Sequence, residues 1–213
     1  MEGATEPRSG WVAPELREEF PGLALRYMLV ERGSGRSPRE VKERLKELAG
    51  RFSGAQAINM RHQPIPWAYR VFYRHIGLDP DEQHTPVEEL VLERMRKGGF
   101  PSKSLLDDAL TIAIADSGVA VRAFDADRVE GALGIRPSAA GEPLEGRPGE
   151  LPPGTLVIAD EVRPLALLFG ALASGRGVRP KTRRTLLCAV QVKGVPDIAA
   201  EEALWLAAGV LQG

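Results

Sequence analysis

The sequence predicts a mixed α/β (α+β) domain, because helical and strand patterns are separated along the chain instead of alternating. Helical patterns crowd the first half of the 213 residues, and short strand patterns divided by glycine and proline follow in the second half. A regular alternation of strands and helices, which would indicate a parallel sheet, is not found. We assign residues 22–213 to one domain with an N-terminal strand-helix extension, and residues 1–21, which show no clear period, to a flexible arm.

The first half begins with a strand over residues 22–33, where apolar residues are dense enough for burial. A helix follows, with Ser37 as its N-cap, Pro38 at its first position and Glu40 closing a capping box. Helical spacing of apolar residues predicts two more helices, over residues 65–77 and 85–95. The second of these begins with the same capping pattern, at residues 85–88.

The second half begins with a helix over residues 104–115 and a strand over residues 119–124. Short apolar segments between turn residues then predict strands over residues 131–135, 155–159, 164–169 and 185–192. Asp197 fits the N-cap of a closing helix. The Gly- and Pro-rich stretch over residues 138–153 is interpreted as a surface loop of the same domain.

Composition indicates a globular cytoplasmic protein without a strong electrostatic signature. The chain is 43% hydrophobic and 27% charged, and its net charge of −1 provides no global positive field for nucleic acid. Cys188 is the only cysteine, so no disulfide can form within the chain, and three scattered histidines predict no metal site. The polar start does not look like a signal peptide, and no apolar run is long enough to span a membrane.

The most specific feature of the sequence is an ordered series of short motifs over residues 69–196. The series includes Tyr69-Arg70, Gly77-Leu78-Asp79-Pro80, Val87-Glu88-Glu89-Leu90, Phe100-Pro101, Asp107-Asp108-Ala109-Leu110-Thr111 and Phe124-Asp125-Ala126-Asp127. In order and spacing it resembles free-standing B3/B4 proteins, which are similar to the editing and tRNA-recognition domain of the phenylalanyl-tRNA synthetase beta subunit. The resemblance implies a single B3/B4-type domain, with mixed or antiparallel sheet layers flanked by helices.

The resemblance also implies an activity and a partner. The synthetase domain hydrolyses tyrosine wrongly attached to the phenylalanine tRNA, a reaction that requires a positioned water and donors for the developing oxyanion. Carried over, it makes Asp108 and Thr111 the catalytic candidates and Arg122, Phe124 and Asp125 the substrate-binding ones. It implies tRNA or aminoacyl-tRNA as partner, a small amino acid as a further ligand, and no metal or organic cofactor.

Three positions depart from the family pattern. By this alignment Thr111 replaces a pocket asparagine, Arg122 a histidine, and Cys188 a glutamate on the closing strand. Selection of tyrosine depends on groups that bond its hydroxyl, so these changes leave open a pocket for another amino acid, or a pocket that only binds.

Each candidate also has a structural interpretation. Asp108 can be an exposed helix acid or cap, and Thr111 can face a neighbouring turn. Asp125 is interpreted as mainly structural. Arg122 either points outward or reaches a cavity, where it would bind a carboxylate or a terminal-nucleotide phosphate. Cys188 is predicted to pack in the core rather than to act as a nucleophile. The three histidines, His62, His75 and His84, could act as acid or base, but they lie outside the best-matching pocket segments and are expected to be solvated.

A basic segment over residues 175–184 is the candidate tRNA contact. Its glycines and proline predict a flexible loop, and its cations can contact the phosphates of an RNA backbone. These cations are Arg176, Arg179, Lys181, Arg183 and Arg184. A solvated loop that offsets acidic surface explains it equally well. The few aromatic residues are expected to lie in the core, which disfavours a stacking platform for single strands.

Three hypotheses follow from the sequence. The first is a free-standing factor that binds aminoacyl-tRNA and deacylates mischarged species, with water as the nucleophile. The second is a module that binds tRNA or a free amino acid without catalysis, and the third is a protein–protein adaptor on the same scaffold. A structure separates them, since recognition requires a cavity with converging polar groups.

Overall fold

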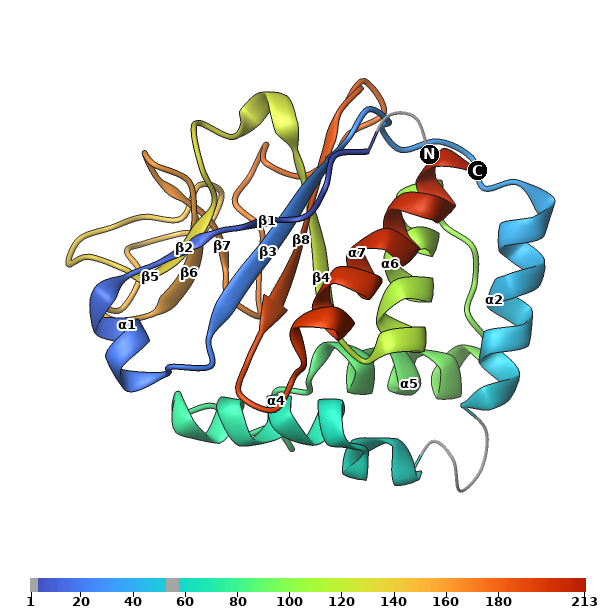
Figure 1. Cartoon of the computed structure of the whole chain (residues 1–213), viewed down its shortest axis with the longest axis horizontal. Coiled ribbons are helices and arrows are strands. Elements are labelled where there is room, and N and C mark those ends of the chain that lie inside the picture. Colours follow the sequence, from blue (N-terminus) through green and yellow to red (C-terminus); the bar gives the residue numbers. More distant parts are fainter. Residues whose placement is uncertain (1–3, 53–57) are drawn as a thin grey trace.

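One β-sheet lies near the centre of the molecule, a second β-sheet lies beside it on the left, and most helices lie to the right and below (Figure 1). The structure is a computed structural model, and it describes residues 4–52 and 58–213. The mixed α/β fold predicted from the sequence is confirmed. Among the described helices, none is long and apolar enough to cross a membrane.

The first sheet is antiparallel and has the strand order β1-β3-β8-β4. Its strands are β1 (Arg8–Ser9), β3 (Ala24–Val30), β8 (Thr185–Gln191) and β4 (Ala120–Asp125). Every residue of β8 is buried, as expected for a strand between two others that is covered on both faces. Segments from both ends of the chain therefore meet in this sheet.

The second sheet has the order β2-β5-β6-β7 and lies on the opposite side of the first sheet from the helices (Figure 1). Its strands are β2 (Trp11–Val12), β5 (Gly134–Pro137), β6 (Leu156–Ala159) and β7 (Pro164–Leu167). The β2–β5 pair is parallel and the other two pairs are antiparallel. All five strands predicted in the second half are thus present, three of them in this sheet.

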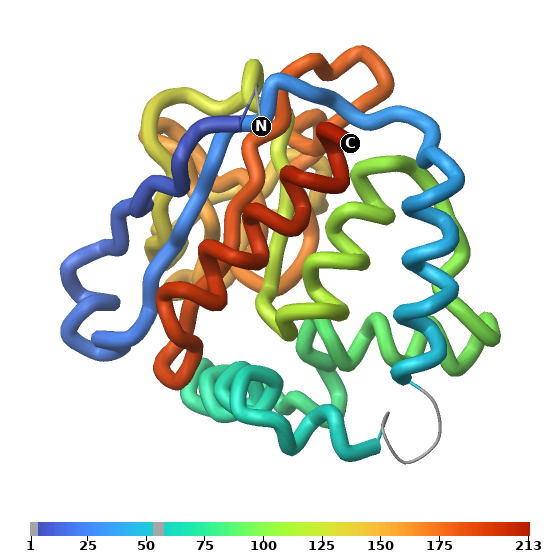
Figure 2. The backbone as a smooth tube through the Cα atoms, turned by 45° about the vertical axis from the view of Figure 1, so that its right-hand side comes forward, coloured from blue at the N-terminus to red at the C-terminus, as the bar shows by residue number. Residues whose placement is uncertain are grey.

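Helices cover the remaining face of the first sheet and its lower end (Figures 1 and 2). Helix α7 (Asp197–Gln212) contacts β8 and β3, α6 (Leu105–Ser117) packs beside α7 and against β4, and α2 (Arg39–Arg51) packs on α6. Helices α4 (Pro64–His75) and α5 (Pro86–Lys97) run below the sheet, after the 3-10 turn η1 (Met60–His62). A short turn, η2 (Ala126–Arg128), follows β4.

Residues 8–19, expected to belong to a flexible arm, form β1, β2 and the helix α1 (Pro14–Glu19). Strand β1 pairs with β3 in one sheet, and β2 pairs with β5 in the other. Two-residue strands and a six-residue helix show no detectable period, so their order depends on partners elsewhere in the chain. The segment joins the edges of both sheets.

The helix start signals have different outcomes. Thr85 forms the predicted capping box with Glu88, whose carboxylate accepts hydrogen bonds from the Thr85 amide at 3.0 Å and hydroxyl at 2.8 Å. The prediction for Ser37 is wrong, because α2 starts after Pro38 and the Ser37 hydroxyl instead donates to Asp108. Asp197 is likewise the first residue of α7 rather than its N-cap.

Candidate ligand-binding site

Arg122 projects from β4 toward the second sheet. Its guanidinium donates to the carbonyl oxygen of Leu167 at 3.2 Å, at the end of β7, and to that of Gly170 at 2.8 Å, in the turn that follows. Burial lowers the pKa of Arg122, and the charge of Glu89 acts in the opposite direction. Of the two alternatives that the sequence left open, the structure thus shows the one in which Arg122 reaches a cavity.

The register of the first sheet places two of the substituted positions side by side. Arg122 on β4 is the direct partner of Cys188 on β8, and Cys188 is in turn the partner of Tyr27 on β3. Cys188 is fully buried, and burial raises the pKa of its thiol to about 12. Its expected place in the core is confirmed, and the thiol stays protonated near neutral pH.

A cavity of about 380 Å³ opens beside Arg122. Such a volume lies in the range of small-ligand sites. Its walls come from α4, α5, α6, β4, β8 and the turn after β7, and its apolar members include Ile114, Ala120, Val121, Phe169 and Val190. Polar side chains also reach it, namely Tyr73, His84, Glu89, Glu93 and Arg122.

The charged groups of this cavity differ in their pairing. Glu93 bonds Lys97 at 2.6 Å and forms an ion pair with Lys103 at 3.0 Å, and these two cations lower its pKa. Glu89 is exposed, and Arg122 has no carboxylate at ion-pair distance among the described residues. Arg122 and Glu89 are therefore the charged groups left for a ligand.

Asp108, a catalytic candidate, lies on α6, and three hydrogen-bond donors of the protein contact its carboxylate. It is buried and accepts hydrogen bonds from the hydroxyls of Ser37 at 2.5 Å and Ser102 at 2.6 Å, and from the Lys103 amide at 3.0 Å. Thr111 is half-buried one turn further along the helix. Neither lines the Arg122 cavity as described, so the structure does not bring the three candidates together.

The other substrate-binding candidates lie at the end of β4. Phe124 is fully buried in the core. Asp125 accepts hydrogen bonds from the Thr182 hydroxyl at 2.6 Å and the Asp127 amide at 3.2 Å. These contacts hold the start of η2 against the basic segment and agree with the mainly structural interpretation of Asp125.

Several cations of the basic segment are held by the protein itself. Arg176 is buried, makes two 3.0 Å hydrogen bonds to Glu145 and donates to the Arg128 carbonyl at 2.8 Å. Arg184 forms an ion pair with Asp127, and Arg179 donates to the Gly175 carbonyl at 3.0 Å. Lys181 and Arg183 are exposed.

Of the polar groups that reach the cavity, the sequence predicts only Arg122 as a site residue, and it does not predict the exposed aromatic residue Trp67. The other polar groups are Tyr73, His84, Glu89 and Glu93. Glu89 stands in the Val87–Leu90 motif, so the motif contained a signal that was not used. Trp67 is 45% exposed, stacks on His62 at 6.3 Å between ring centroids and has the Arg74 guanidinium 5.8 Å from its ring. The expectation that aromatic residues lie in the core is wrong for Trp67.

The fold and the site together define a mixed α/β domain with a small-ligand cavity between its sheets and helices. The B3/4 domain family matches residues 68–200, well over half of the chain. The chain belongs to the B3/4 domain family. The resemblance seen in the sequence is thereby confirmed.

The similar curated proteins include phenylalanine–tRNA ligase beta subunits from several bacteria. The subunit from Xanthomonas oryzae pv. oryzae is 41% identical over 101 residues, which is 45% of this chain and 12% of that protein. The subunit from Yersinia pestis is 36% identical over 100 residues, again 45% and 12%. The subunit from Legionella pneumophila is 31% identical over 109 residues, which is 50% and 14%. The chain therefore spans about an eighth of the length of these relatives.

Proposed function

We propose that this protein binds the aminoacyl end of tRNA and holds the amino-acid group in the Arg122 cavity. The observation that carries the proposal is that one cavity of about 380 Å³ is lined both by the Arg122 guanidinium, which has no carboxylate at ion-pair distance among the described residues, and by the exposed carboxylate of Glu89. An aminoacyl ester has a cationic ammonium and a carbonyl oxygen that accepts hydrogen bonds. The two groups of the cavity match these two features.

The cavity gives each part of such a ligand a partner. Arg122 donates two N–H groups to backbone carbonyl oxygens, and these bonds orient the plane of its guanidinium. Its other N–H groups remain for a ligand oxygen. Glu89 offers a counter-charge to the ammonium. Ile114, Val190 and Phe169 present apolar surface to a side chain. Asp108 has no part in this proposal, because three donors already occupy its carboxylate.

Contact with the tRNA itself is the second part of the proposal. The relatives are named as tRNA ligase subunits, which suggests an RNA partner for this member of the family. Lys181 and Arg183 remain exposed in the basic segment and suit phosphate contacts. Trp67, flanked by His62 and Arg74, offers an aromatic face and a cation to an unpaired base.

The test compares aminoacylated tRNAs with the same tRNAs in uncharged form. We expect tighter binding of at least one charged species. Arg122→Gln should remove this preference, at least about tenfold in affinity, and leave the uncharged form unaffected. Arg147→Gln, at an exposed arginine outside the cavity, is the matched control. Equal affinity of the intact protein for all charged and uncharged tRNAs would overturn the proposal.

Ester hydrolysis is a second candidate function, and His84 is the observation that favours it. His84 lines the cavity, and its Nδ1 lies 3.3 Å from the Pro80 carbonyl oxygen. In the neutral imidazole, an Nδ1 that donates this bond leaves Nε2 without a proton, so that Nε2 can accept one from water. Incubation with a panel of mischarged tRNAs tests it. His84→Ala should slow deacylation about 100-fold without weakening binding, and no hydrolysis of any species would exclude the activity.

A further inference from the structure

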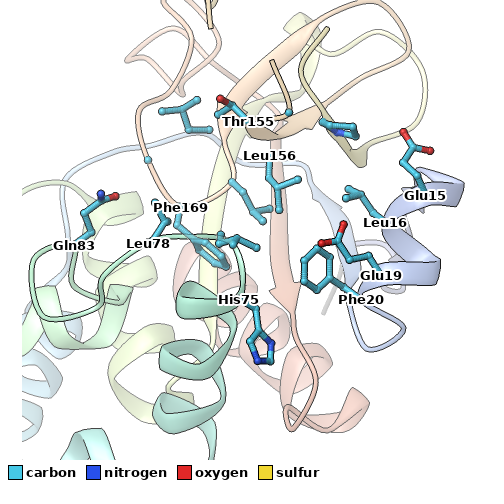
Figure 3. Close-up of a pocket in the computed structure, with 16 residues that line it drawn as sticks. Glu15, Leu16, Glu19, Phe20, His75, Leu78, Gln83, Thr155, Leu156 and Phe169 are labelled. Atoms are coloured by element: carbon cyan, nitrogen blue, oxygen red, sulfur yellow. The ribbon is translucent and has the colours of Figure 1, made fainter. Parts of the chain in front are cut away.

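A second, larger cavity lies on the other side of the turn that holds Arg122. It measures about 550 Å³ and shares only Leu168, Phe169 and Gly170 with the Arg122 cavity. Helix α1 forms one wall, the end of α4 and the following loop form another, and β6 and the end of β7 close it (Figure 3). Part of this site therefore comes from residues that precede the 68–200 family match.

The cavity has a preformed apolar lining. Leu16, Leu156 and Leu168 contribute aliphatic surface, and Phe20 and Phe169 contribute two rings. Phe20 is held edge-on against Phe72 at 5.2 Å between centroids, and Phe169 packs on Tyr73 at 4.8 Å. Rings fixed by the core lose little freedom when a ligand enters, which favours binding.

The charge of the lining has one sign near neutral pH. Glu15 and Glu19 stand four residues apart, so they lie on one face of α1, and Figure 3 shows Glu19 reaching toward the cavity. Both are exposed and have no ion-pair partner among the described residues. The described lining contains no Lys or Arg, and His75 is its only basic side chain.

We propose that this cavity binds a small organic cation with an apolar or aromatic body, such as an arylalkylamine. The body would contact the leucines and the two rings, whose faces also attract a cation, and the ammonium would lie near Glu15 and Glu19. The volume lies within the range of small-molecule sites. A phosphate or carboxylate is disfavoured by the two glutamates, and neither Arg122 nor Glu89 belongs to this lining, so the site is distinct from the tRNA and aminoacyl contacts proposed above.

The experiment uses three probes that share one ring: phenethylamine, 2-phenylethanol and 3-phenylpropionate. Binding to the full chain is measured by calorimetry and by the NMR shifts of residues around Leu156. We expect the amine to bind most tightly and the carboxylate least. The double substitution Glu15→Gln with Glu19→Gln should weaken the amine roughly three- to tenfold and leave the alcohol unchanged.

The matched control is Glu18→Gln, on the same short helix but outside the lining, which should leave all three affinities unchanged. Glu89→Gln removes the exposed carboxylate of the Arg122 cavity and lies outside the lining of this second cavity, so it should also leave the three affinities unchanged and keep this test independent of the proposed aminoacyl site. Equal binding of amine and alcohol would overturn the proposal in favour of a purely apolar site. Absence of binding by all three probes, or an equal loss with Glu18→Gln, would overturn it outright.

Discussion

Asp108 and Arg122 are both charged side chains that the protein shields from water, but they differ in the partners that surround them. Asp108 is 2% exposed and accepts hydrogen bonds from two hydroxyls and one amide. Arg122 has two carbonyl acceptors, no carboxylate at ion-pair distance among the described residues, and a cavity beside it. The three donors fix the Asp108 carboxylate away from the Arg122 cavity, whereas Arg122 lines that cavity without a counter-charge and can bind a ligand there.

The difference matters because both residues were functional candidates on the same sequence argument. The three donors of Asp108 come from the loops before α2 and before α6, so its carboxylate holds two chain segments on one helix. Arg122 instead holds the turn that separates the two cavities. We therefore expect Asp108 to determine stability and Arg122 to determine affinity.

Asp108→Ala should give the largest effect on stability. Removing the carboxylate leaves the buried hydroxyl of Ser37 without a partner and breaks two part-buried hydrogen bonds, so we expect the free energy of unfolding to fall by about 3 kcal/mol. Denaturant unfolding measures it. Asp107→Ala, at the exposed neighbour, should cost about 1 kcal/mol or less.

The same pair of variants can break the comparison. If Asp108→Ala proved as stable as Asp107→Ala and abolished ligand binding instead, Asp108 would be a site residue. The structural role assigned to its carboxylate would then be wrong. Affinity for aminoacyl-tRNA, measured well below the unfolding transition, distinguishes the two outcomes.

Tyr69→Phe should have an intermediate effect, because Tyr69 is a saturated group at the border of the cavity. Its hydroxyl donates to the Val190 carbonyl at 2.5 Å and accepts from the Ala120 amide at 3.0 Å. Val190 and Ala120 both line the Arg122 cavity. We expect a loss of about 2 kcal/mol in the free energy of unfolding and a smaller loss of affinity.

Two observations would count against this interpretation of Tyr69. One is unchanged stability, which would mean that water replaces the hydroxyl. The other is a loss of affinity larger than that of Arg122→Gln. Tyr27→Phe serves as the control, since Tyr27 is only half-buried on β3.

What the sequence could and could not predict follows from the distance between partners. The capping box of Thr85 and Glu88 is confirmed because its partners stand three residues apart. Ser37 was misassigned because its partner, Asp108, lies 71 residues away. The alignment marks Arg122 as a candidate site residue. It cannot show where the side chain points, because that depends on the carbonyl acceptors at the end of β7 and in the following turn. The convergence of His84 and Glu89 on it requires the three-dimensional fold.

The smallest predicted effect concerns the thiol opposite Arg122. Burial raises the pKa of Cys188 to about 12, and the nearby charge of Arg122 opposes this. An unfolded thiol titrates near about 8.5, so the contribution of Cys188 to stability is complete below that pH and is lost as the pH rises toward 12. Between pH 8 and 10 the free energy of unfolding should fall roughly 1.5 kcal/mol more for the intact chain than for Cys188→Ala, measured by denaturant titration. If the free energy of unfolding fell equally with pH for the intact chain and for Cys188→Ala, the charge of Arg122 would offset the effect of burial on the thiol. The sheet face behind the cavity would then be a more polar environment than the burial of Cys188 indicates.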